Sequence, residues 1–128
     1  MNLLLDTQLL LWIASEPGKV PKKVRALLKD ETNTPLFSAA SLWEISIKNA
    51  IGRKDFQVNA ALLKRGLVDN GWEELAITSS HTLATEHLPP IHKDPFDRML
   101  LAQAEVEGFM LYTTDKQLAK YPGPVKLV

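Results

Sequence analysis

Short apolar runs alternate with segments of helical spacing along the chain, and this alternation limits the possible folds more than any other feature. The runs at residues 3–5, 36–38 and 109–114 are mainly continuous, which is typical of strands buried on both faces of a sheet. We also expect an edge strand at 72–77, with two glutamates on its solvent-exposed face, and a last strand at 125–128. Strands that alternate with helices predict the α/β class, with a central, mostly parallel sheet of about four to five strands and helices on both faces.

Apolar residues recur at helical spacing between these runs. Val24, Leu27 and Leu28, for example, form one apolar stripe among lysines and an arginine that we expect on the solvated face. Because no repeat or low-complexity linker interrupts the pattern, residues 1–128 are expected to form one domain. The expected helices cover 8–14, 21–30, 40–51, 59–69, 79–88 and 95–107, with one or two helical turns at 116–120 and a basic turn at 53–56.

Composition is that of an ordinary globular protein, with 45% hydrophobic and 23% charged residues. No apolar run approaches the roughly 20 residues that cross a bilayer, and no basic segment precedes the first apolar run, so neither a membrane span nor a signal peptide is expected. The absence of cysteine fits a reducing, cytoplasmic environment. A formal net charge of zero excludes a basic wrapper of nucleic acid, so any such contact must be local or mediated by metal.

The segment at residues 94–104 places an acid at a fixed position on a helix. Asp94 is a favourable N-cap, and Pro95 suits the first helical position because no N–H is needed there. Asp97 therefore falls in the first turn, where its charge complements the positive end of the helix dipole. That role is sufficient for an isolated aspartate, but three other acids stand at comparable junctions.

Those acids are Asp6, Glu44 and Asp115. Asp6 and Asp115 each end an expected strand, and ligands of parallel sheets bind beyond the carboxyl ends of the strands. Glu44 has apolar neighbours on its helix, and a surface ion pair with Lys48 explains it as well as a role at a site does. Converging carboxylates persist with raised pKa values or with a bound cation, and oxygen ligands suit Mg²⁺ or Mn²⁺.

The histidines and tryptophans are not expected to take part in this chemistry. The histidines show no metal-ligand spacing, so we expect them at the surface rather than as ligands or acid–base groups: His81, His87 and His92. The tryptophans are most simply core residues, although they also suit interfaces: Trp12, Trp43 and Trp72.

Four short motifs, taken in order and spacing, resemble the PIN-domain family, specifically the PilT N-terminus or VapC-type bacterial toxins. Each motif alone is weak, but the ordered set is specific and spans nearly the whole chain. The motifs are LLLDT at 3–7, SAASLWEI at 38–45, DPFDR at 94–98 with QA at 103–104, and TTD at 113–115.

The resemblance implies a metal-dependent endoribonuclease in which acids hold Mg²⁺ or Mn²⁺ and water is the nucleophile. Asp6, Asp97 and Asp115 would be direct or water-mediated ligands, and Glu44 would complete the metal site or orient the water. Four further residues have accessory roles by the same resemblance. Thr7 and Thr114 would hydrogen-bond the site or a phosphate oxygen, Arg98 would touch RNA or pair with an acid, and Asp94 would mainly cap its helix.

One departure from the family pattern is visible at Gln8, where many such sequences have histidine. The substitution leaves the expected metal ligands intact, so it bears on substrate choice more than on chemistry. The resemblance also implies a homodimer and a small antitoxin protein that blocks the cleft.

Three other readings of the acids compete with this one. A haloacid-dehalogenase-type phosphatase needs a second aspartate two residues after the first, where Gln8 stands. A receiver domain needs an adjacent acid pair after its first strand, which this chain lacks. The remaining alternative is a PIN-like RNA- or protein-binding module with a structural or inactive metal site, which the four intact acids and the neutral net charge disfavour.

Overall fold

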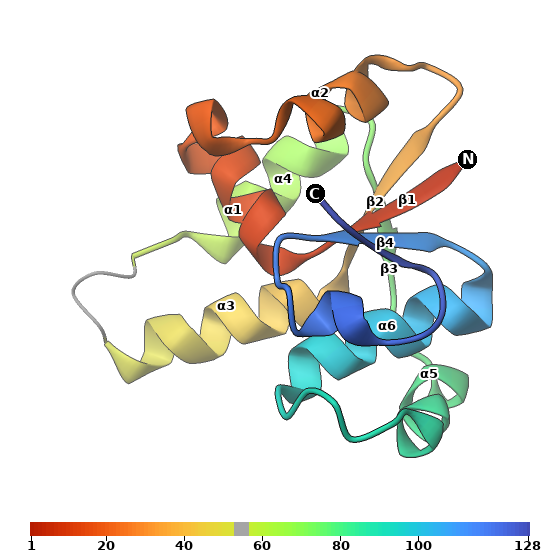
Figure 1. Cartoon of the computed structure of the whole chain (residues 1–128). Coiled ribbons are helices and arrows are strands. Elements are labelled where there is room, and N and C mark those ends of the chain that lie inside the picture. Colours follow the sequence, from red (N-terminus) through yellow and green to blue (C-terminus); the bar gives the residue numbers. More distant parts are fainter. Residues whose placement is uncertain (53–56) are drawn as a thin grey trace.

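A computed structural model describes residues 1–52 and 57–128, and over these ranges the chain forms a five-stranded parallel sheet with helices on both faces (Figure 1). All four neighbouring strand pairs are parallel, in the order β3-β2-β1-β4-β5. The predicted α/β class is confirmed, and the sheet is wholly rather than mostly parallel. The strands are β1 Asn2–Leu5, β2 Thr34–Ser38, β3 Glu73–Leu75, β4 Met110–Thr113 and β5 Val125–Leu127.

The helices follow the predicted segments, with differences at three short ones, of which the 3₁₀ turn Pro17–Lys19 was not predicted. The segment at 79–88 divides into an α-helix and a 3₁₀ turn, and the turns at 116–120 are 3₁₀. The predicted basic turn at 53–56 lies outside the described residues. The helices are α1 Thr7–Ser15, η1 Pro17–Lys19, α2 Lys22–Lys29, α3 Ala39–Ile51, α4 Ala60–Asp69, α5 Ser79–Ala84, η2 Thr85–His87, α6 Pro95–Glu107 and η3 Leu118–Lys120.

Strand β1 lies at the centre of the sheet, and its leucines alternate between two hydrophobic cores. Leu3 and Leu5 pack in a core with residues of α1, α2 and α4, whereas Leu4 packs on the other face with residues of α6 and η3. Figure 1 shows these two layers, with α1, α2 and α4 above the sheet and α5 and α6 below it. A strand buried on both faces must be apolar throughout, which is why this run is continuous.

Helix α6 crosses the second face and has well-defined ends. The Asp94 side chain accepts hydrogen bonds from two first-turn N–H groups, Pro95 occupies the first turn, and Gly108 ends the helix with φ 73°. Between these ends, Leu100 and Leu101 are fully buried, and burying a leucine contributes about 1.5–3 kcal/mol. The predicted N-cap is therefore confirmed, and it places the first turn of α6 at one edge of the sheet.

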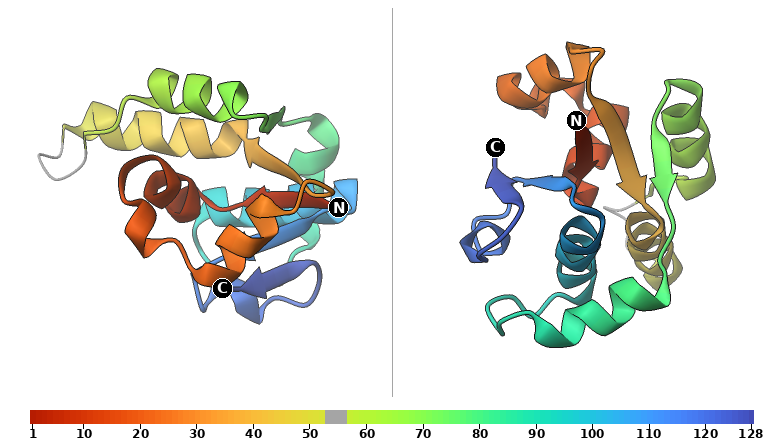
Figure 2. Two further views of the ribbon diagram at one scale, coloured as in Figure 1. Left: turned by 90° about the horizontal axis from the view of Figure 1, so that it is seen from above. Right: turned by 90° about the vertical axis from the view of Figure 1, so that its right-hand side faces the viewer.

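The strand order reverses direction at β1, as the views in Figure 2 show. From β1 the chain proceeds outward to β2 and β3, and it then returns to the other side of β1 to form β4 and β5. Neighbouring β1 and β4 therefore define a topological switch point, beyond whose carboxyl ends ligands bind in open α/β sheets.

The three tryptophans differ in their environments. Trp72 is buried in the first core and Trp12 packs against it. Trp43 is 58% exposed, so its assignment to the core was wrong. Its ring meets Phe96 edge to face, with centroids 5.2 Å apart, and the pair joins the surfaces of α3 and α6.

Among the described residues, every helix is too short or too polar to cross a membrane.

Gly108→Ala and Gly66→Ala provide a matched test of the end of α6. Both added methyl groups would enter open space, but only Gly108 has a positive φ, so alanine is strained there and favourable within α4. We expect Gly108→Ala to lower the free energy of unfolding by about 1 kcal/mol and Gly66→Ala to raise it by about 0.5–1 kcal/mol. Urea denaturation measures both, and an equal effect of the two substitutions would contradict this account of the helix end.

Candidate metal centre

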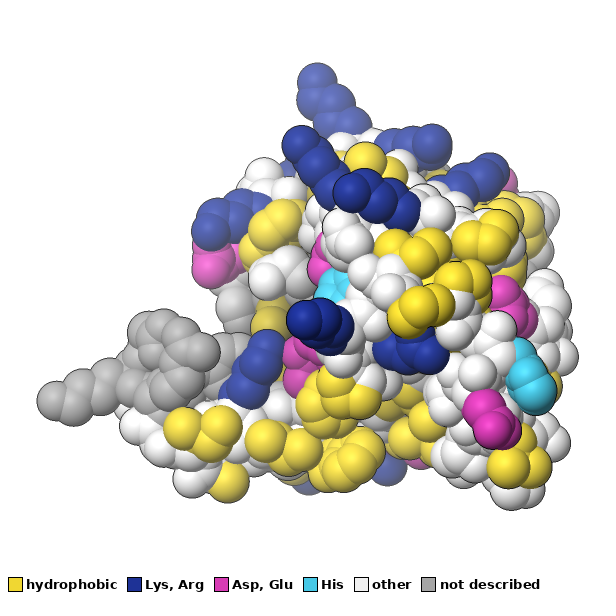
Figure 3. Space-filling model, turned by 60° about the horizontal axis from the view of Figure 1, so that its bottom comes forward, with side chains coloured by type: hydrophobic (Ala, Val, Ile, Leu, Met, Phe, Trp, Pro, Cys, Tyr) yellow, Lys and Arg dark blue, Asp and Glu magenta, His cyan; other side chains and the backbone are white. Residues whose placement is uncertain are grey.

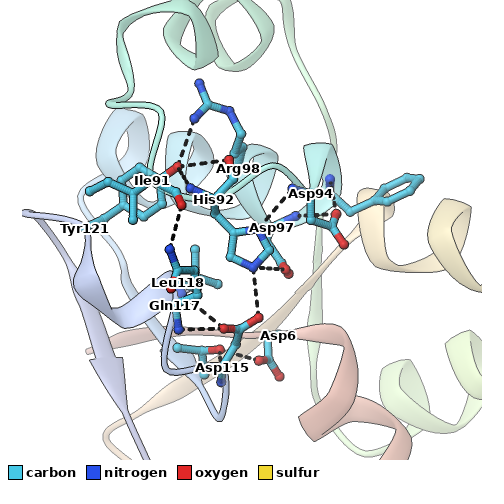
Figure 4. Close-up of polar contacts among 12 residues, drawn as sticks. Asp6, Ile91, His92, Asp94, Asp97, Arg98, Asp115, Gln117, Leu118 and Tyr121 are labelled. Carbon is cyan, nitrogen blue, oxygen red and sulfur yellow. Dashed lines mark hydrogen bonds and ion pairs between the residues drawn. The ribbon is translucent and has the colours of Figure 1, made fainter.

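Four carboxylates predicted from the sequence line one cleft of about 260 Å³ at the carboxyl ends of β1 and β4. They come from the end of β1, the middle of α3, the first turn of α6 and the end of β4. Figure 4 shows three of them, Asp6, Asp97 and Asp115, directed toward a common centre. The lining residues are Asp6, Thr7, Gln8, Leu11, Glu44, Lys48, Asp97, Thr114 and Asp115.

Asp6 is the most buried of the four, at 4% exposure, and both of its oxygens accept backbone hydrogen bonds. Oδ1 accepts from the Leu9 N–H at 2.9 Å and so caps α1. Oδ2 accepts from the Thr113 hydroxyl at 2.6 Å and from the Thr114 N–H at 3.3 Å. Burial raises the pKa of Asp6 above its ordinary value, although these hydrogen bonds oppose the shift.

Asp97 lies in the first turn of α6 and is the acid most affected by its neighbours. Burial raises its pKa from 3.8 to about 7, and the charge of Asp94 adds to this effect. His92 opposes the shift, whereas Glu44 and Asp6 raise the pKa further. The carboxylates thus act on one another electrostatically as well as lining the same cleft.

Asp115 follows β4 and is held by hydrogen bonds to both oxygens. Oδ1 accepts from the N–H groups of Gln117 at 2.8 Å and Leu118 at 3.2 Å, and Oδ2 lies 2.9 Å from Nε2 of His92. Partial burial disfavours the charged form, but the hydrogen bonds from His92 and the two N–H groups outweigh it and lower the pKa of Asp115. Asp115 is therefore the anchored, ionised member of the group.

Glu44 forms the predicted ion pair and also lines the cleft. Its Oε2 accepts from Lys48 Nζ at 2.9 Å, so the ion pair exists. The carboxyl group is nevertheless buried, with Glu44 8% exposed, rather than at the surface. Among the described residues, Oε1 finds no hydrogen-bond partner although it is buried. A buried anionic oxygen without a partner is costly, so a cation in the cleft would satisfy it.

His92 is one of two residues at the cleft that the sequence did not predict. Its side chain is 15% exposed, and Nε2 lies 2.9 Å from Asp115 Oδ2 and 3.3 Å from Asp97 Oδ2. Each of these three residues offers a candidate ligand atom, and the atoms lie within 4.8 Å of one another. The signal was its position two residues before the N-cap of α6, which brings a side chain to the same edge as the first turn.

The expected surface position was wrong for a second histidine as well. His81 is fully buried, where Nδ1 accepts from the Thr78 N–H at 3.0 Å and Nε2 contacts Glu107 Oε1 at 2.9 Å. Only His87 is exposed as predicted. A capping box at the start of α5 explains the burial of His81, because the ring replaces the glutamate or glutamine that usually occupies this position.

The threonines at the cleft form hydrogen bonds with its acids and with the neighbouring helix. Thr7 donates to the buried Ser41 hydroxyl at 2.9 Å and thereby links α1 to α3. Thr114 uses its backbone N–H on Asp6, whereas the hydroxyl that reaches Asp6 belongs to Thr113. Thr113 was not predicted, because a threonine within a strand is indistinguishable in sequence from one that only fills the pleated surface.

Arg98 is directed away from the acids. Its guanidinium donates to the carbonyl oxygens of Pro89, Leu88 and Thr85 and to the Tyr121 hydroxyl. None of these acceptors is a carboxylate, and Arg98 is not among the cleft-lining residues of the described chain. Of the two expected roles, the ion pair with an acid is therefore replaced by hydrogen bonds to the segment that precedes α6, and contact with RNA stays a prediction.

Together the fold and the cleft define a parallel α/β domain with an acidic cluster, at its switch point, that could hold a metal ion. The sequence matches the PIN-domain family over residues 3–124, so the chain belongs to the PIN-domain family. A comparison with curated proteins found no match.

Solved structures from three bacteria share the fold. VapBC2 from Rickettsia felis, crystallised with a DNA fragment from its promoter, aligns at 16% identity and a TM-score of 0.73, covering 99% of this chain and 98% of the other. DNA-bound VapBC from Salmonella typhimurium aligns at 17% identity and a TM-score of 0.68, covering 98% and 97%. VapBC-1 from nontypeable Haemophilus influenzae aligns at 19% identity and a TM-score of 0.56, covering 90% of this chain and 87% of the other.

Asp97→Asn tests the electrostatics of the cleft through the pH dependence of stability in EDTA. A raised pKa means that the folded state holds a proton that the unfolded state has released, so wild-type stability falls as pH rises from about 4 to about 7. The asparagine variant lacks this loss. We expect the two proteins to be equally stable near pH 4 and the variant to be about 1–2 kcal/mol more stable at pH 8, after allowance for solvent screening.

Asp69→Asn, at the exposed end of α4 and outside the residues that line the cleft, is the matched control for the loss of one carboxylate. Urea denaturation across this pH range measures all three proteins. Parallel profiles for wild type and Asp97→Asn would contradict a raised pKa at Asp97.

Proposed function

We propose that this chain is a metal-dependent endoribonuclease that hydrolyses RNA phosphodiester bonds, and that it is the toxin of a type II toxin–antitoxin pair. The observation that carries the proposal is the meeting of four acids from four separate elements in one cleft, including the buried Glu44 Oε1. A purely structural role for Glu44 would not explain a buried carboxylate oxygen that has no hydrogen-bond partner among the described residues. Membership of the PIN-domain family supports the same conclusion.

The acidic residues fit Mg²⁺ or Mn²⁺, which take carboxylate oxygens and keep several waters. Asp6, Asp97, Asp115 and Glu44 would hold the ion, directly or through water. When bound, such an ion acts as a Lewis acid that activates a water and stabilises negative charge on the scissile phosphate. The protein's own contribution is to fix the carboxylates on rigid elements before the substrate arrives.

Lys48 would offer positive charge to a phosphate backbone at the cleft. Lys48 lines the cleft and its side chain is 41% exposed. In Figure 3, Lys and Arg side chains (dark blue) lie beside acidic (magenta) and histidine (cyan) side chains near the middle of the displayed face. Because the chain has no net charge, this local arrangement would provide the attraction for RNA.

Protein partners enter the proposal through the related structures and one feature of α3. The related VapBC structures are complexes, two of them bound to DNA. In this chain Trp43, Ile47 and Ile51 are exposed and spaced four residues apart, which gives α3 an apolar outer stripe. We propose that such surfaces serve a homodimer and a small antitoxin protein.

Cleavage of a mixed RNA pool tests the proposed reaction. Purified protein is assayed with Mg²⁺, with Mn²⁺ and with EDTA, beside Asp97→Asn and the distant control Asp69→Asn. We expect cutting with either ion, none in EDTA, at least about a 100-fold loss in Asp97→Asn and no loss in the control.

Cleavage that persists in EDTA or in Asp97→Asn would contradict the assignment. Absence of cutting, together with no metal-dependent shift in melting temperature, would favour the binding module instead. The Asp97 variant is preferred to Asp6→Asn for a structural reason. Each Asp6 oxygen accepts a backbone N–H, so the amide of asparagine would point a donor at a donor and weaken the fold itself.

A further inference from the structure

His92 bridges two acids that come from distant parts of the chain. Nε2 lies 2.9 Å from Asp115 Oδ2, after β4, and 3.3 Å from Asp97 Oδ2, on α6. Figure 4 shows the imidazole between the two carboxylates, with Nε2 directed at both. The ring is the only group drawn there that contacts both acids. It could therefore act either as a third metal ligand or as a support for the Asp97 and Asp115 carboxylates.

The opposite side of the ring decides between these roles. Nδ1 lies 3.0 Å from the Asp94 backbone nitrogen and accepts its N–H. An N–H can donate only to a nitrogen that carries no proton, so in the neutral ring the proton belongs on Nε2. A protonated Nε2 donates hydrogen bonds and has no lone pair for a metal ion. Ligation through Nε2 would move the proton to Nδ1, where it would face the Asp94 N–H.

The backbone around His92 is fixed independently of the cleft. The His92 N–H donates to the Tyr121 hydroxyl at 2.8 Å, and Arg98 donates to the same hydroxyl at 2.9 Å. Gln117 Nε2 donates to the Ile91 carbonyl oxygen at 2.7 Å. Arg98 also donates to the carbonyl oxygens of Thr85, Leu88 and Pro89. The loop that carries the His92 ring is therefore held in place by hydrogen bonds outside the cleft (Figure 4).

We infer that His92 is a positioning residue of the metal centre: its Nε2–H holds the Asp97 and Asp115 carboxylates side by side to receive a cation that it does not itself bind. The inference rests on the proposed metal-dependent function. A carboxylate oxygen has more than one lone pair, so Asp115 can accept from Nε2–H and still face the ion. Asp97 Oδ2, at 3.3 Å from the same nitrogen, is held by electrostatic attraction to this side of the ring. Hydrogen bonds of this kind orient ligating carboxylates, and losing one costs about 10- to 100-fold in metal affinity.

A matched pair of variants separates the two sides of the ring. In His92→Asn the side-chain oxygen can replace Nδ1 as the acceptor for Asp94, but nothing replaces the donor at Nε2. In His92→Gln the longer amide carries an N–H to the position of Nε2. His87→Gln, on the exposed turn η2, is the control.

The dissociation constants of Mg²⁺ and Mn²⁺ are measured by isothermal titration calorimetry for wild type and the three variants. We expect His92→Asn to weaken the binding of both ions by about 10- to 100-fold and to equal extents. His92→Gln should recover most of the affinity, and His87→Gln should match wild type. Thermal unfolding in EDTA shows whether each variant is folded.

Unchanged affinity in His92→Asn would overturn the inference. A much larger loss for Mn²⁺ than for Mg²⁺ would also overturn it, because imidazole is a better ligand for transition metals and such selectivity would identify His92 as a ligand. A wild-type protein that binds neither ion would instead overturn the proposed function itself, and with it this inference.

The tautomer of wild-type His92 gives a test that does not depend on a variant folding. Long-range ¹H–¹⁵N NMR spectra distinguish a ring protonated at Nε2 from one protonated at Nδ1. We expect the proton to remain on Nε2 when saturating Mg²⁺ is added. Transfer of the proton to Nδ1 on addition of Mg²⁺ would show ligation through Nε2 and contradict the positioning role.

Discussion

The buried carboxylate of Asp6 joins three parts of the structure that the sequence keeps apart. It ends β1, caps α1 through Oδ1 and binds the end of β4 through Oδ2. Its burial opposes ionisation, and these hydrogen bonds partly offset that cost. Because β1 and β4 are neighbours at the switch point, the same contacts that close the fold also create the acidic edge. Stability and the candidate site therefore depend on one group, and substitutions there cannot separate the two.

The remaining acids differ in how their charges are stabilised. Asp115 is held ionised by donors, whereas Asp97 has its pKa raised by burial and by the neighbouring carboxylates. Glu44 is paired at one oxygen with Lys48, and its other oxygen has no hydrogen-bond partner within residues 1–52 and 57–128. Such an arrangement is unfavourable without a counter-ion, and a divalent cation would relieve the repulsion at each of these positions. The cleft is thus better suited to a cation than to the empty state.

Sequence reasoning located the strands, the capped helix and the four acids, because these follow from local periodicity and from the rule that parallel strands end at one edge. It did not locate His92 or Thr113, whose roles depend on contacts between residues far apart in the chain. It also placed Trp43 in the core, since an exposed aromatic residue on an apolar helix has the same local pattern as a buried one. The ion pair expected at Arg98 was wrong for a related reason: its partners are carbonyl oxygens and the Tyr121 hydroxyl, whose positions leave no trace in the sequence.

We propose that the four carboxylates form a binding site for a divalent cation. Anomalous diffraction from crystals grown with Mn²⁺ tests this claim most directly, for the wild type and for Asp97→Asn. We expect one or two strong peaks in the cleft of the wild type, in contact with oxygens of Asp97 and Asp115, and a marked loss of density in the variant. A cleft without an anomalous peak at saturating Mn²⁺ would contradict the account.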